Sequence, residues 1–259
     1  MRWLLLGLLL PLKVCALYNG NPSLPMMPEM GPFISRDAWV GIKVGYEFDW
    51  VYSSPLKGQS QHLSDSKAHG YESMQNFGVV TLNFSDRVEL FGDVGSMECQ
   101  LHHAKIEKNR LSYVSKSDFA WEVGGRAIIA YWGDLQFAIN AAFLRSDPAL
   151  SSLKLNSISY SKEKAHIDLT SWQIGLGTSY RFCWCVPYVG VSYTKFRAKV
   201  EHLKSLSFLI PSQQVVFENN DEFGVFLGFG IGLNKALSLN MEGRFISENA
   251  LSISADFKF

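Results

Sequence analysis

Hydrophobic and polar residues alternate one by one along much of this chain. Between residues 38 and 52 the even positions from Val40 to Tyr52 are apolar or aromatic, whereas the odd positions are mostly glycine and charged residues. A period of two is the signature of a β-strand, because successive side chains point to opposite faces. The pattern therefore predicts a strand with one apolar face and one polar face.

The same alternation recurs in nine further segments. They cover residues 78–84, 87–95, 119–131, 135–143, 171–182, 187–193, 223–233, 237–245 and 251–259. Most of them have the length of roughly 9 to 13 residues that a tilted strand needs to cross a bilayer, whereas strands of soluble proteins average about five or six. Strand length therefore favours a membrane barrel.

The connections between these segments alternate between long and short. Long polar links at 53–70, 98–117, 147–165 and 197–221 are followed by tight links at 85–86, 133–134, around 183–185 and at 234–235. Outer-membrane barrels combine long outer loops with short periplasmic turns in this way. We therefore predict an all-β chain whose residues 38–259 form a transmembrane antiparallel up-and-down β-barrel of about 10 strands, with 8–12 possible.

Aromatic residues lie near the predicted strand ends, as expected for the two girdles at the membrane surfaces. They are Trp39, Trp50, Tyr52, Phe84, Phe119, Tyr131, Trp172, Phe182, Tyr193 and Phe245. The alternative is that strands favour aromatic residues in any setting. The chain ends on apolar odd positions with Phe257 and Phe259, which fits either an assembly signal for the barrel-insertion machinery or an ordinary closing strand.

Residues 1–16 have the form of a signal peptide. Arg2 precedes an apolar run from Leu4 to Leu12, and small residues up to Ala16 provide a cleavage site. A lipid-bearing Cys15 is the alternative, which the valine before it disfavours. We expect residues 17–37 to form a periplasmic N-terminal segment. No later run of about 18 apolar residues provides a spanning helix.

Charge is balanced, with 24 basic and 24 acidic residues, so nothing indicates a nucleic-acid partner. No nucleophile elbow, phosphate-binding loop or metal-ligand spacing occurs, so we expect no cofactor, no metal and no enzyme activity. His166 and Asp168 share one face near a strand end, and with Asp65 or Asp147 they form the one hydrolytic alternative that we consider. Solvated loop residues are the simpler interpretation.

Charged residues on the polar strand faces are the candidate pore lining. They are Lys43, Glu47, Asp49, Arg87, Glu89, Asp93, Glu122, Arg126, Arg181, Glu242 and Arg244. In an open channel such residues select solutes and ions. In a barrel of this size the interior can instead fill with side chains, and the charges then pair into a polar plug. Glycines on the same face favour open space slightly, or else relieve crowding at bends.

Several segments resemble the chlamydial major outer membrane porin family. The matching pieces are GNPSLP (20–25), VGYEFDWV (44–51), RVELFGDVGS (87–96), EVGGRA (122–127), SYRF (179–182), VPYVGV (186–191), LNMEGRFISE (239–248) and ADFKF (255–259). The resemblance implies an outer-membrane porin that also reinforces the envelope through disulfides. This chain is shorter than the principal members and has few cysteines, so its barrel should be narrower and its share in cross-linking smaller.

The mature chain has an odd number of cysteines in an oxidising compartment. Cys99 lies beyond the outer end of a predicted strand, whereas Cys183 and Cys185 lie at a periplasmic corner, too far away for a disulfide with Cys99. Cys183 and Cys185 are therefore candidates for an intermolecular bond, and unpaired thiols are the alternative.

We predict an outer-membrane, multi-pass porin-like barrel that lets small solutes or ions diffuse passively and contributes to envelope structure. The alternative is a plugged barrel that acts as an adhesin or structural protein. Its long loops carry the basic residues Lys105, Lys108, Arg110 and Lys116. Expected partners are outer-membrane lipid, the assembly machinery, and further copies or disulfide-linked envelope proteins.

Overall fold

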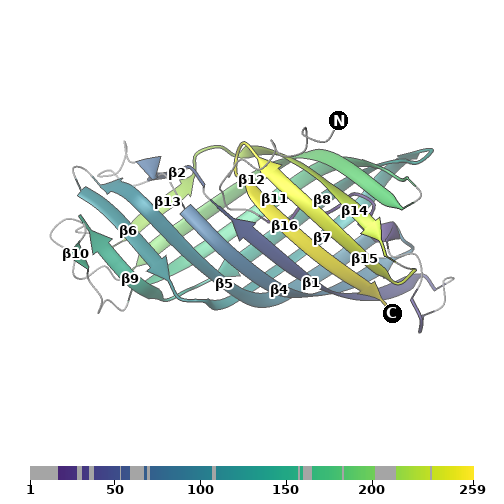
Figure 1. Cartoon of the computed structure of the whole chain (residues 1–259), viewed down its shortest axis with the longest axis horizontal. Coiled ribbons are helices and arrows are strands. Elements are labelled where there is room, and N and C mark those ends of the chain that lie inside the picture. Colours follow the sequence, from purple (N-terminus) through teal and green to yellow (C-terminus); the bar gives the residue numbers. More distant parts are fainter. Residues whose placement is uncertain are drawn as a thin grey trace, which may run out of the picture.

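The computed structural model describes residues 17–27, 31–34, 38–52, 54–58, 67–68, 71–106, 109–156, 158–159, 165–182, 184–201, 214–233 and 235–259. Ten antiparallel strands form a closed ring, and Figure 1 shows the barrel with its long axis horizontal. They are β1 (Val40–Val51), β4 (Tyr71–Phe84), β5 (Val88–Ile106), β7 (Asp118–Trp132), β8 (Leu135–Ser146), β11 (His166–Tyr180), β12 (Cys185–Glu201), β14 (Phe223–Gly232), β15 (Leu237–Phe245) and β16 (Ala250–Lys258). The predicted ten-stranded barrel is confirmed.

The ring closes between the first strand and the last. β1 pairs with β16 from Lys43 opposite Lys258 to Val51 opposite Ala250. Beyond this ladder, the Phe259 N–H donates to the Ile42 carbonyl at 2.9 Å. Closure satisfies the backbone groups of both terminal strands, which hydrocarbon cannot do.

Short turns join the strands at the end where the C-terminus lies. Between β4 and β5, Ser85 and Asp86 have φ of 51° and 54°, the positive pair required by a type I′ hairpin turn. Between β7 and β8, Gly133 has φ of 62°. By the usual arrangement of outer-membrane barrels, this is the periplasmic end.

The outer surface of the barrel is apolar along the half that begins at the short turns. Its exposed side chains include Ile42, Val44, Val80, Leu82, Leu90, Val94, Val123, Ile139, Ile174, Leu176, Val191 and Leu227. Aromatic pairs lie at both limits of this surface. Trp39 packs on Phe84 and Tyr180 on Phe182 near the short turns, and Trp50 packs on Tyr52 and Trp172 on Tyr193 at the opposite limit.

The predicted polar loops contain six further strands. They are β2 (Leu56–Gly58), β3 (Lys67–Ala68), β6 (Asn109–Ser115), β9 (Leu150–Leu155), β10 (Ile158–Ser159) and β13 (Val215–Asn219). β6 and β9 extend the sheet from β5, whereas β13, β2 and β3 extend it from β12. A bridge between Ala149 and His166 joins the β9 end to β11. We call these six strands and the outer ends of β5, β11 and β12 the cap, which lies at the left of Figure 1.

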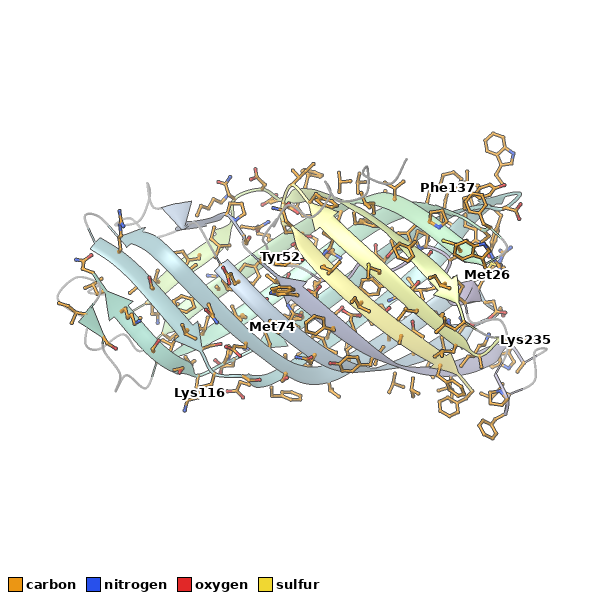
Figure 2. All side chains as sticks on the ribbon, viewed as in Figure 1. Met26, Tyr52, Met74, Lys116, Phe137 and Lys235 are labelled. Atoms are coloured by element: carbon orange, nitrogen blue, oxygen red, sulfur yellow. The ribbon has the colours of Figure 1, made fainter. Side chains whose placement is uncertain are left out.

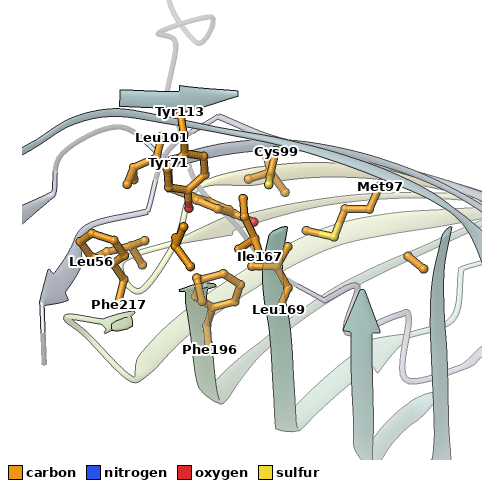
Figure 3. Packing of buried hydrophobic residues seen from close by; sticks show 14 of the residues in the cluster. Leu56, Tyr71, Met97, Cys99, Leu101, Tyr113, Ile167, Leu169, Phe196 and Phe217 are labelled. Carbon is orange, nitrogen blue, oxygen red and sulfur yellow. The ribbon is translucent and has the colours of Figure 1, made fainter. Parts of the chain in front are cut away.

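The interior of the cap is apolar. Figure 3 shows side chains from separate strands converging there, among them Leu101, Ile167, Leu169, Phe196 and Phe217. The same strands carry polar inward side chains nearer the short turns: on β12, Ser192 and Thr194 point inward below Phe196, Ala198 and Val200. This change lies beyond residue 193, where the predicted strand ended.

Residues 17–27 lie inside the barrel, with a short 3-10 helix, η1 (Leu24–Met26), at the end of the segment nearer the periplasm. The prediction of a periplasmic segment is therefore wrong for these residues. Residues 31–34 lie at the short-turn end, where Phe33 stacks on Phe259 with ring centroids 6.1 Å apart. No helix within the described ranges is long and apolar enough to cross a membrane. The predicted signal peptide, 1–16, lies outside the described residues.

Candidate functional site

The lumen of the membrane half contains residues 17–27, which we call the plug. The upper part of the plug, farther from the short turns, is held by Glu242 of β15. The two carboxylate oxygens of Glu242 accept the N–H groups of Asn19 and Gly20 at 2.9 and 3.0 Å. Gly20 has φ of 79°, and a side chain there would also press against Arg126. The Tyr188 hydroxyl donates to the same carboxylate at 3.2 Å. Charge-assisted bonds of this kind are among the stronger hydrogen bonds in proteins.

The lower part of the plug is held by polar side chains from several strands. Lys43 donates to the carbonyls of Leu24, at 2.6 Å, and Met27, while also forming an ion pair with Glu89 at 2.5 Å. Asn83 donates to the Pro25 carbonyl at 2.6 Å. The Ser23 hydroxyl donates to Gln136, and in the upper part Asn140 and Gln173 donate to the carbonyls of Asn19 and Leu17. The plug is thus bonded around the wall.

A second polar cluster surrounds Arg244, the largest fully buried side chain among the described residues. Its guanidinium lies 2.5 Å from Asp49, 3.5 Å from Glu242 and 3.4 Å from Glu248. Glu248 belongs to the loop between β15 and β16, and burial raises the pKa of its carboxyl well above the usual range although Arg244 opposes the shift. One cation thus links two strands and a loop to the plug anchor, Glu242.

The structure places most of the predicted pore-lining residues inside the barrel. Buried there are Lys43, Glu47, Asp49, Glu89, Asp93, Glu122, Glu242 and Arg244. The Arg126 side chain is 12% exposed and lies 4.7 Å above the Phe91 ring. Arg181 is half-buried near the short turns, 3.8 Å from the Met26 sulfur.

Arg87 is a correction to that set. It lies in the turn before β5, is exposed, and stacks over the Tyr131 ring at 5.1 Å. The alternation that places Glu89 inside begins only at Val88, so extending it back to a turn residue predicted the wrong face.

The glycines of the inward face leave little open space. A Cβ at Gly190 would lie 2.2 Å from the Phe226 ring, and one at Gly177 would lie 2.8 Å from Pro22 of the plug. A Cβ at Gly230 would lie 2.5 Å from the Asn21 amide. These glycines make room for an inward aromatic ring and for the plug. Beside the plug, a cavity lined by Asn19, Arg126 and Phe226 has a volume of about 10 Å³, the space of roughly one water molecule.

The two cysteines among the described residues, Cys99 and Cys185, are not in disulfide bonds. Cys99 is a buried free thiol in the cap, and Cys185 is a half-buried free thiol at the start of β12. Cys183 lies outside the described residues, so the predicted intermolecular disulfide remains a prediction.

The two residues of the hydrolytic alternative lie beside different partners. His166 lies 3.4 Å from Glu201 and 4.0 Å from Asp147, while Asp168 lies 3.5 Å from Arg145. Asp65 lies outside the described residues. Over the described part of the chain, no group of three or more His, Cys, Asp or Glu side chains is arranged to hold a metal ion.

Sequence reasoning missed the plug and the amide side chains that bind it. The stretch LYNGNPSLP carries no strand or helix period. Two features of the sequence could have indicated the plug. This stretch is rich in Asn, Gly and Pro, and the predicted inward faces also carry uncharged polar residues such as Asn83, Gln136 and Asn240.

No protein-family model matches the chain. Two curated relatives, both named major outer membrane porin of Chlamydia pneumoniae, are 21% and 20% identical to it over alignments of 291 residues, covering 79% of this chain and 74% of theirs. Among solved structures, the β domain of the Bordetella autotransporter BrkA is 11% identical, with 85% of this chain and 100% of that one covered and a TM-score of 0.44.

The attachment invasion locus protein Ail of Yersinia pestis is 10% identical to this chain, with 85% of this chain and 97% of that one covered and a TM-score of 0.40. Both curated relatives carry the name porin. The closed antiparallel ring, its apolar outer surface and the location of these relatives place the chain in the outer membrane as a multi-pass β-barrel.

Proposed function

We propose that this protein is a closed barrel that anchors the cap at the cell surface, where it acts as a structural or adhesive element. The observation that carries the proposal is the filled interior. The plug occupies the lumen of the membrane half, and the apolar core occupies the cap. Barrels of about eight to ten strands are narrow enough for side chains to fill them.

The second candidate is a passive pore for small solutes or ions, which the names of the curated relatives favour. Solute passage would require that the plug leave its bonds with Glu242 and Lys43 and that the cap core open as well. The charged lumen residues, Arg126 among them, would then set ion preference.

Planar-bilayer recording of the purified protein separates these candidates. We expect no steady conductance from the natural chain. Deleting residues 17–27 alone should also give none, because the cap core still closes the outer half. Combining that deletion with Leu169→Ser and Phe196→Ser, which break the core, should produce conductance steps.

Steady conductance from the natural chain would contradict the closed-barrel proposal and support the pore. In that case Arg126→Glu should change the ion preference of the steps. The variant Arg87→Glu is the matched control, because Arg87 is exposed outside the lumen.

Adhesion is tested on the cap. Arg110 and Lys116 are exposed there, whereas the side chains of Lys105 and Lys108 lie outside the described residues. Protein in lipid nanodiscs should bind host-cell surfaces, and Arg110→Glu with Lys116→Glu should weaken that binding. If the protein in nanodiscs binds no cell surface, the adhesive role is contradicted and only the structural role remains.

A further inference from the structure

A pocket opens on the outer surface beside the ends of β1 and β4, where β5 continues into the cap. Its volume is about 50 Å³, and its lining includes Trp50, Glu72, Met74, Glu98 and Gln100. Figure 2 labels Met74 and Tyr52 near the middle of the long axis, far from both the short turns and the tip of the cap. The pocket is outside the lumen and independent of the plug.

The strand register brings these side chains together. Trp50 is opposite Met74, and Met74 is opposite Glu98. One row nearer the tip of the cap, Glu72 is opposite Gln100. Directly opposite side chains have Cβ atoms about 5 Å apart, and diagonal neighbours about 7–8 Å. Glu72 and Glu98 are therefore diagonal neighbours, with the Trp50 indole beside them.

The chemistry of the pocket suits a small cation. Glu98 is half-buried and, within the described part of the chain, makes no hydrogen bond or ion pair. Trp50 offers an aromatic face, and its ring centroid lies 4.5 Å from that of Tyr52. Carboxylates and aromatic faces both attract ammonium groups. A volume of about 50 Å³ admits a single ammonium-sized group rather than a drug-sized ligand.

The pocket lies at the outer limit of the lipid-facing surface. Towards the short turns, the outward residues of the same strands are apolar, with Val80 54% exposed and Val94 59% exposed. Gly92 lies opposite Val80 and two residues from Val94 on β5, and it faces open space, since a Cβ there would meet nothing within 4 Å. On the cap side of this band, Ser96 and then Glu98 follow along β5. An amphiphile whose acyl chain lies on the apolar band therefore has its head group at the pocket.

We propose that this pocket binds the primary ammonium of a lipid head group in the outer leaflet, with Glu98 as its principal acceptor. Trp50 covers the ammonium on one side, and the band of Val80, Gly92 and Val94 receives the acyl chain. The assignment applies whether the lumen is closed or conducting.

Native mass spectrometry tests the proposal on the full chain. The protein is reconstituted in vesicles of equal parts phosphatidylethanolamine and phosphatidylglycerol, then extracted, and the retained lipids are counted. We expect about tenfold preferential retention of phosphatidylethanolamine, which corresponds to about 1.4 kcal/mol. Glu98→Gln should remove most of that preference, and Glu98→Lys should abolish it because the new ammonium occupies the pocket.

Glu218→Gln is the matched control, since Glu218 is an outward, half-buried carboxylate on β13, outside the pocket. It should retain the full preference. Equal retention of the two lipids by the natural chain, or an undiminished preference in a folded Glu98→Gln variant, would overturn the proposal. So would binding of an oligolysine peptide at Glu98 without retention of phosphatidylethanolamine, which would point to a protein partner.

Discussion

The two halves of this barrel have opposite polarity although the same strands build both. In the membrane half, β12 directs Ser192 and Thr194 inward and Val189 and Val191 outward. In the cap, the same strand directs Phe196, Ala198 and Val200 inward and Lys195 and Arg197 outward. The backbone alternation does not change at the boundary, but the surrounding solvent changes from lipid to water. The membrane half therefore directs its apolar face outward to lipid, whereas the cap directs its apolar face inward to a core, and both keep apolar side chains away from water.

The comparison also shows how each half fills its interior. The cap packs apolar side chains as a soluble protein does. The membrane half has few inward apolar groups, so it fills with the plug and with ion pairs around Lys43, Arg126 and Arg244. Substitutions in the two halves should therefore lower the stability of the barrel for different physical reasons.

The largest effect is expected from Arg244→Met in the membrane half. This change leaves Asp49, Glu242 and Glu248 buried without their shared cation. Removing one partner of a buried ion pair costs about 3–5 kcal/mol. Urea unfolding of protein in liposomes measures the loss, and Arg87→Met, at an exposed turn, should change stability by less than about 0.5 kcal/mol.

Leu169→Ala tests the cap core. Leu169 is fully buried among apolar side chains, and such a truncation costs about 2–5 kcal/mol. We expect the cap to become sensitive to protease while the heat-resistant migration of the barrel in gels persists. Thr170→Ala, the outward neighbour, should leave protease resistance unchanged. Loss of barrel migration together with the cap would show that the two halves unfold as one unit.

Gly190→Ala tests how tightly the membrane half is filled. The added Cβ would lie 2.2 Å from the Phe226 ring, and overpacking of this kind costs about 1–3 kcal/mol. Gly92→Ala adds the same atom on the lipid side, where it meets nothing within 4 Å. Thermal unfolding of the two variants should differ, and equal midpoints would argue for an open lumen.

The smallest effect is expected from Glu248→Gln. Burial raises the pKa of Glu248, so its ionised form is less stable in the folded chain than in the unfolded one. The neutral amide removes that cost above the ordinary glutamate pKa of about 4.3. The variant should therefore match or exceed the natural chain in stability at pH 8 and lose any gain below pH 4. A stability loss at pH 8 would show that the ionised carboxylate is needed by Arg244.

The sequence predicted the membrane half because two solvents impose a strict period there. From Val40 to Val51, lipid outside and polar groups inside leave one choice of face at each position. It did not predict the cap, because residues 196–200 keep the same period while the polar and apolar faces change places. Within the predicted polar loops 98–117 and 197–221, described inward residues such as Leu101, Val200 and Phe217 are buried and apolar, so the prediction is wrong for them.

The plug could not be predicted, because its position depends on distant contacts. Asn19 and Glu242, its principal contact, are separated by 223 positions, and the segment has no period of its own. The charged lumen residues were found by alternation, but alternation does not distinguish a side chain that faces water from one that faces a bound segment.

The pairing of Asn19 with Glu242 has a consequence for biogenesis. The plug precedes every strand in the order of synthesis, whereas its acceptor lies on β15, the last strand but one. Contacts this remote in sequence form slowly, since the whole intervening chain must first be organised. A nascent molecule halted before β15 would therefore carry an unanchored N-terminal segment. The plug can bind at Glu242 only after the final hairpin, β15 and β16, has been synthesised.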